Sequence, residues 1–143
     1  MTAPTFTVDL VGGPAGLREF SIERTHDLTR EFRLARTRAS RGGSDLPDRF
    51  LALVDRLWGA ADGREALVDP PEQRGGAVRL ELPLGAEHDA LALATLLDEA
   101  DDYCRAGAAL TMPRPPEVVR LRWWQATEAV RQRHGLAATP FPG

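Results

Sequence analysis

Two pairs of adjacent residues carry side chains that could transfer protons or act as nucleophiles. His26 precedes Asp27, and Tyr103 precedes Cys104. A histidine titrates near neutral pH, and a neighbouring carboxylate can orient it as a general base. If the fold formed a cleft from His26, Asp27 and Tyr103, that cleft could bind a small ligand or catalyse a reaction. Nothing else in the chain completes a catalytic triad, so we keep this cleft as the alternative to a non-catalytic function.

An acidic run, Asp98-Glu99-Ala100-Asp101-Asp102, raises the question of a metal site. Asp98 and Asp102 are four residues apart, so they would share one side of a helix. Hard cations usually need oxygens that converge from a loop, and this run has no glycine turn and no EF-hand spacing. The histidines lack the spacing of a zinc site, and the single cysteine fits a buried helical stripe. We therefore expect no metal and no cofactor. The acidic side would be solvated or paired with arginines of a neighbouring helix.

The segment MPRPPEVVRLRWW, residues 112–124, places two adjacent tryptophans among arginines. A helix is predicted from Pro116 to about His134, since proline suits a first turn and a glycine follows the helix as its C-cap. One apolar stripe of that helix would bury Trp123 against a core, and Trp124 would then point ~100° away.

Tryptophan and arginine dominate the energetic hot spots of protein interfaces, so the outward side of this helix is a candidate partner-binding patch. The first candidate patch comprises Arg120, Trp124, Glu128 and Arg131. The second candidate comprises Asp98 and Asp102 of the acidic run. One alternative stays open, in which Trp124 is a lid over the edge of the core with arginine side chains stacked on its ring.

The elements that must position these residues follow from hydrophobic periodicity. Alternating apolar residues predict two strands, at 5–11 and 77–84, and amphipathic stretches predict four helices, at 15–39, 45–58, 86–106 and 116–134. The expected order is β-α-α-β-α-α, a helix-dominated α+β fold in a single domain spanning 1–143, with a flexible tail from about 136. Two strands make a marginal sheet, so they should pair beneath the helices or extend across a homodimer.

Composition narrows the possible partners and the compartment. The net charge is −3, and Phe32 is the only aromatic residue within the arginine-rich stretch 30–41, so we expect neither nucleic acid nor a membrane surface as partner. No segment has the ~20 apolar residues of a membrane span, and the N-terminus shows no signal-peptide pattern. A single cysteine cannot form an internal disulfide, which favours a reducing compartment. We expect a cytoplasmic protein.

Four segments carry a resemblance to a known family: THDLTREFRLA (25–35), LPDRFLALVDRL (46–57), VRLELP (78–83) and LLDEADDYCRAGAALTMPRPPEVVRLRWW (96–124). In this order they resemble a family of small, uncharacterised actinobacterial proteins, associated with anti-sigma-type ATP-binding regulators of stress signalling. The resemblance implies a signalling context but no catalytic residue. The chain departs from the family pattern at Met112-Pro113-Arg114 and in its second tryptophan. The chain contains no asparagine, so the ATP-binding boxes of those regulators are absent.

These observations favour a non-catalytic, cytoplasmic protein–protein interaction or regulatory module, within stress signalling of the anti-sigma type. The expected partner is another protein, and the chain itself is expected to form a homodimer. An enzyme or small-ligand binder that uses the His26, Asp27 and Tyr103 cleft is the alternative.

Overall fold

The computed structural model describes residues 4–37, 45–70, 77–107 and 111–142. The elements are β1 (Thr5–Val11), α1 (Ala15–Thr37), α2 (Leu46–Gly59), a short 3-10 helix η1 (Arg64–Leu67), β2 (Ala77–Pro83), α3 (Ala86–Arg105) and α4 (Pro116–Arg133). The predicted helix-dominated α+β class and the order β-α-α-β-α-α are confirmed. Residues 38 and 39, which the sequence pattern assigned to the first helix, lie outside the described part of the chain.

The two strands form an antiparallel sheet within one chain. Val8 lies opposite Leu80, and both are buried because side chains alternate between the two faces of a strand. The opposite face is polar, and there Thr5 donates a hydrogen bond to Glu81 across the sheet at 2.9 Å. α4 contacts β1. The strands therefore pair beneath the helices, which is one of the two arrangements that the sequence left open.

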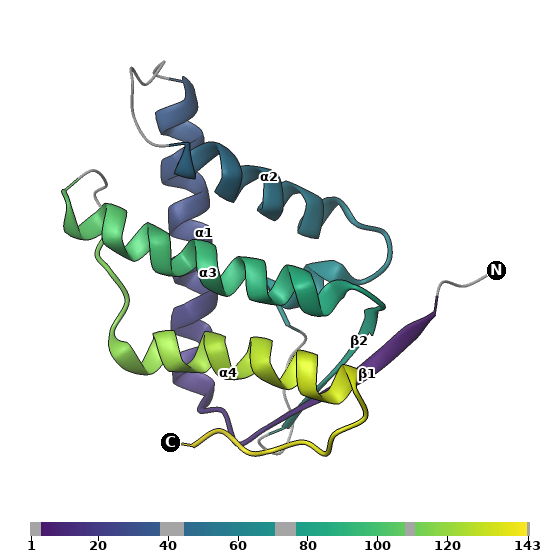
Figure 1. Ribbon diagram of the computed structural model, residues 1–143. Coiled ribbons are helices and arrows are strands. Elements are labelled where there is room, and N and C mark those ends of the chain that lie inside the picture. The colour runs from purple at the N-terminus through teal and green to yellow at the C-terminus, as the bar shows by residue number, and fades with distance from the viewer. Residues whose placement is uncertain (1–3, 38–44, 71–76, 108–110, 143) are drawn as a thin grey trace.

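The helices form a row with one helix crossing behind it. Figure 1 shows α2, α3 and α4 side by side, with α3 in the middle and α1 passing behind them. The chain reverses direction between α3 and α4, so the last turns of α3 lie beside the first turns of α4. This geometry brings the acidic run of α3 next to the residues that precede the two tryptophans.

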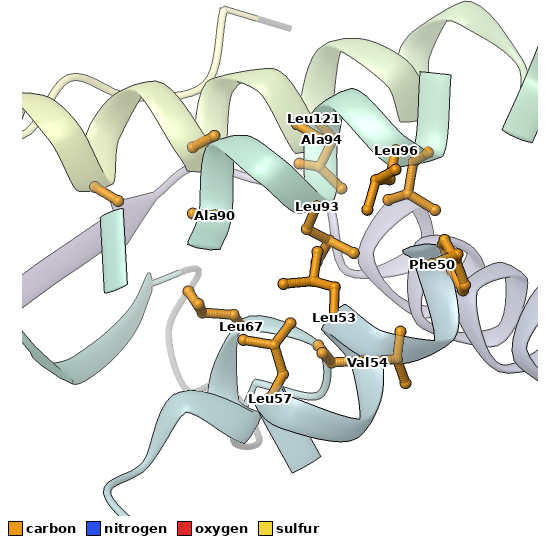
Figure 2. Packing of buried hydrophobic residues seen from close by; sticks show 14 of the residues in the cluster. Phe50, Leu53, Val54, Leu57, Leu67, Ala90, Leu93, Ala94, Leu96 and Leu121 are labelled. Atoms are coloured by element: carbon orange, nitrogen blue, oxygen red, sulfur yellow. The ribbon is translucent and has the colours of Figure 1, made fainter. Parts of the chain in front are cut away.

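The core lies between this row of helices, α1 and the inner face of the sheet. Leu53, Val54 and Leu57 project from α2 towards Leu93 of α3, as Figure 2 shows, and all four are buried. Burying one such side chain contributes about 1.5–3 kcal/mol, so this interface fixes α3 in the middle of the row.

The end of the chain, which we expected to be a flexible tail, lies against α4 and β1. The Phe141 backbone N–H donates to the Val11 carbonyl at 2.9 Å, and the Phe141 side chain is only 9% exposed. Its ring packs edge-on against Trp124 with 5.3 Å between the ring centres. Gly135 has φ of 83°, the left-handed conformation that ends α4 and directs the tail back along the helix.

Candidate functional site

Trp124 is more buried than Trp123, whereas the helical wheel predicted a buried Trp123 and a Trp124 that points away from the core; Trp123 still packs against the core. Trp124 is 9% exposed, and its indole N–H donates to the Thr139 carbonyl of the tail at 3.1 Å. Trp123 is only partly buried, and its indole N–H donates to Asp98 Oδ2 at 2.8 Å. The prediction assumed that α4 has one buried side. In the structure α3 and α1 cover part of the helix, and β1 and the tail cover another part.

Glu128 of the first candidate patch is also buried, with 1% of its surface exposed. Its carboxylate accepts hydrogen bonds from the Thr139 backbone N–H at 2.6 Å, the Thr139 hydroxyl at 2.8 Å, Arg131 at 2.7 Å and Gln132 at 3.2 Å. Burial alone would raise the pKa of Glu128, but these hydrogen bonds outweigh it and the net pKa is lowered. Glu128 therefore holds the tail in place.

The first candidate patch is consequently not a continuous exposed surface. Trp124 and Glu128 are buried, Arg131 binds Glu128, and Arg120 is the exposed member of the four. This corrects the expectation that Trp124 projects into solvent. The sequence left two interpretations of Trp124 open. The contacts of Trp124 match the one in which its ring covers the edge of the core, although the residue packed against that ring is Phe141 and not an arginine.

The partly exposed tryptophan joins the second candidate patch instead. Trp123 and Val119 are four residues apart on α4, and Asp98 and Asp102 are four residues apart on α3, so each pair lies on one side of its helix. A hollow of about 260 Å³ is lined by Asp98, Asp101, Asp102, Arg105 and Val119. We name the surface formed by Asp98, Asp102, Val119 and Trp123 the α3–α4 face.

Asp102 also borders a second hollow, on the side of α3 that faces α2. This hollow measures about 340 Å³ and is lined by Leu46, Glu99, Asp102 and Tyr103. The Asp102 side chain is 80% exposed and pairs with Arg105 of its own helix at 2.8 Å. A strongly exposed carboxylate thus lies between two concave surfaces.

Buried arginines fix the base of the α3–α4 face. Asp101 is 2% exposed and accepts from Arg114 Nε at 2.9 Å and from Arg24 Nη2 at 3.3 Å. Arg114 Nη2 also donates to Asp98 Oδ1 at 2.7 Å. The acidic run is therefore partly paired with arginines, which is one of the two arrangements that the sequence left open. Arg24 and Arg114 were not predicted, because single arginines in a helix and in a proline-rich connection show no periodic pattern.

The residues of the alternative cleft contact different parts of the molecule. The His26 ring packs edge-on against Trp58 of α2 at 5.2 Å, and the Tyr103 ring packs against Phe32 at 5.7 Å. His26 and Phe32 are six residues apart on α1, which is ~9 Å along the helix axis. Asp27 pairs with Arg30 on the surface.

Cys104, the neighbour of Tyr103 that could act as a nucleophile, is 7% exposed. Burial raises the pKa of its thiol, and the hydrogen bond from Arg24 Nη2 at 3.6 Å only partly offsets that effect. A neutral, buried thiol is a poor nucleophile. These contacts give His26, Tyr103 and Cys104 packing roles.

Two further features concern metals and membranes. Within the described ranges, no three His, Cys, Asp or Glu side chains are grouped so that they could hold a metal ion. Among the helices described here, none is long and apolar enough to cross a membrane.

No protein-family model, curated protein or solved structure matches this chain. The resemblance to actinobacterial signalling proteins therefore stays a prediction, and the functional argument depends on the geometry of the α3–α4 face.

Proposed function

We propose that this chain is a non-catalytic protein–protein interaction or regulatory module whose α3–α4 face binds a basic segment of another protein. The observation that carries the proposal is the position of Asp102, 80% exposed between two hollows of about 260 and 340 Å³. Hollows of this size accept side chains of a partner, and a carboxylate between them attracts an arginine or lysine.

The face combines an apolar element with acidic groups. Trp123 and Val119 are partly buried, so they offer apolar surface beside the carboxylates. Asp98 is held by Arg114 and Trp123 at 2.7 and 2.8 Å, so it would lose little freedom on binding. The exposed Asp102–Arg105 pair is worth only about 0.3–0.5 kcal/mol, so a guanidinium of the partner can replace Arg105 at low cost.

The proposal keeps the wider context that the sequence suggested. A cytoplasmic role in stress signalling of the anti-sigma type would suit a small module that binds another protein and performs no reaction. A homodimer is part of the same proposal. A second copy could present Arg30 and Arg33 of α1, whose side chains are 74% and 54% exposed, to the α3–α4 face in exchange for their ion pairs with Asp27 and Asp55.

The experiment compares two charge reversals on matched exposed aspartates. Asp102→Arg changes the α3–α4 face, and Asp48→Arg changes an aspartate of α2 whose side chain is 75% exposed. A phage-displayed library of arginine-containing peptides is selected on the wild-type chain, and the Kd of each enriched peptide is measured on all three proteins. We expect Asp102→Arg to weaken binding at least tenfold and Asp48→Arg to change it less than twofold.

Two results would contradict the proposal. One is the absence of any enriched basic peptide, and the other is a set of peptides that bind Asp102→Arg as tightly as the wild type. Sedimentation of the three proteins tests whether a second copy of the chain occupies this face. If the wild type is a dimer and Asp102→Arg dissociates it, the α3–α4 face is the homodimer contact and not the binding site of a different protein.

A further inference from the structure

A small cavity lies on the inner side of the sheet, away from the α3–α4 face. Its volume is about 30 Å³. The walls are mainly apolar and come from both strands, η1, α3 and α4; they include Val8, Leu80, Ala66, Leu93, Ala126 and one charged residue, Arg122. A space of this size holds about two water molecules, or the three or four heavy atoms of a small organic ion.

Arg122 is buried, at 5% exposure, and its described hydrogen bonds all go to neutral oxygens. Nε donates to the Ser21 hydroxyl at 2.7 Å, Nη1 to the Leu67 carbonyl at 2.9 Å and Nη2 to the Thr25 hydroxyl at 3.4 Å. A guanidinium has five N–H groups, so these three bonds leave two without a partner in the described part of the chain.

No carboxylate among the described residues pairs with Arg122, in contrast to the other two buried arginines. Arg24 and Arg114 share Asp101. Burial, and to a smaller extent the positive charge of Arg114, lowers the pKa of Arg122 to about 10. Arg122 is thus still charged at neutral pH, and a buried charge without a counterion is costly.

We infer that this cavity binds a monocarboxylate of acetate size, with its carboxylate on Arg122 and its methyl group against the apolar walls. The planar guanidinium matches the geometry of a carboxylate and can bind it through two parallel N–H···O bonds. The walls offer no site for a second charge, and the volume of about 30 Å³ excludes a long acyl chain from the enclosed part. This inference does not depend on the proposed partner-binding function.

The test uses the full chain and sodium acetate, with sodium chloride at equal ionic strength and neutral acetamide as controls. Isothermal titration gives the Kd, and the thermal unfolding midpoint gives an independent readout, because a ligand that binds only the folded state raises the midpoint with increasing concentration. We expect saturable binding of acetate, with no comparable effect of chloride or acetamide.

Three variants locate the site. Arg122→Gln removes the charge, and Ala66→Leu fills the cavity from the partly buried η1 while leaving Arg122 in place. Arg79→Gln is the matched control, since Arg79 lies on the exposed face of β2 with its side chain 76% exposed. We expect binding at least tenfold weaker in the first two variants and unchanged in the third. If Arg122→Gln does not fold, the affinity of the Ala66→Leu variant alone tests the inference.

Two outcomes would overturn the inference. If acetate and chloride have the same effect on the wild-type chain, the cavity holds water and Arg122 serves only to join α4 to α1 and η1. If folded Ala66→Leu binds acetate as tightly as the wild type, the carboxylate binds elsewhere.

Discussion

The indole N–H of Trp123 donates a hydrogen bond to Oδ2 of Asp98 at 2.8 Å. This bond joins α4 to the acidic run of α3, and it connects two segments that the sequence treated as separate candidates. Asp98 also accepts from Arg114 at 2.7 Å, so two donors fix the carboxylate. The bond makes the apolar and acidic parts of the α3–α4 face a single surface.

Trp123→Phe should lower the free energy of unfolding by about 1–2 kcal/mol, because Asp98 loses one donor while its partly exposed carboxylate can still be hydrated. Urea denaturation measures the change. A double-mutant cycle with Asp98→Ala isolates the pair, and we expect a coupling energy of about 0.5–1.5 kcal/mol. A coupling energy near zero would mean that Trp123 contributes by packing alone.

Asp101→Asn should be far more destabilising than Asp102→Asn, although the two residues are adjacent. Asp101 is 2% exposed and is the shared partner of Arg24 and Arg114. Removing its charge leaves the buried guanidinium of Arg24 without a carboxylate among the described residues and leaves Arg114 with Asp98 alone, at a cost of about 3–5 kcal/mol. Among the described residues Asp102 pairs with Arg105, an exposed residue of its own helix, so the loss of its charge should cost less than about 0.5 kcal/mol.

Chemical denaturation of both variants gives this comparison directly. Equal destabilisation by the two substitutions would contradict the buried arginine network beneath the α3–α4 face. A folded Asp101→Asn variant with wild-type stability would also contradict this network.

Stability should depend on pH through Glu128, the carboxylate that holds the tail. Hydrogen bonds from Thr139, Arg131 and Gln132 outweigh the opposing effect of burial and lower its folded-state pKa below the usual 4.5. The unfolded chain therefore binds a proton at higher pH than the folded chain does. The stabilising contribution is complete above the unfolded pKa and is lost as the pH falls through the folded pKa.

Glu128→Gln removes this contribution, so we expect it to lower the free energy of unfolding by about 1.5–3 kcal/mol at pH 7 and by less at pH 3. Urea denaturation at several pH values measures the difference. Glu23→Gln is the control, since Glu23 is exposed on α1 and its substitution should leave the pH profile unchanged. A constant difference between Glu128→Gln and wild type at every pH would refute the assignment.

The fold class could be predicted because each element shows a clear hydrophobic period. Val8 and Leu80 alternate with polar neighbours along their strands, and both are buried in the sheet. α2 carries its apolar residues on one side and buries them against α1 and α3. These elements each have one buried face, and a periodic pattern describes that situation well.

The orientation of α4 could not be predicted, because a periodic pattern describes only a helix with one buried side. α4 is covered on more than one side, and its buried residues include two charged ones, Arg122 and Glu128, that a helical wheel places in solvent. Glu128 is satisfied by Thr139, which lies in an irregular segment eleven positions later. Contacts of this kind have no periodic signature, so the sequence could not reveal that Trp124 is covered and Trp123 is the partly exposed ring.

Cys104 should be unreactive in the folded protein. Its side chain is buried, and burial raises the pKa of the thiol while Arg24 only partly opposes that shift. The reactive form is the thiolate, so a thiol reagent such as DTNB should label native protein at pH 8 at least a hundredfold more slowly than protein unfolded in guanidinium chloride. Asp101→Asn offers a comparison, because loosening the Arg24 network should speed labelling through local opening. Rapid labelling of the native wild type would instead indicate an accessible thiolate, and it would revive the hypothesis of a reactive cleft beside Tyr103.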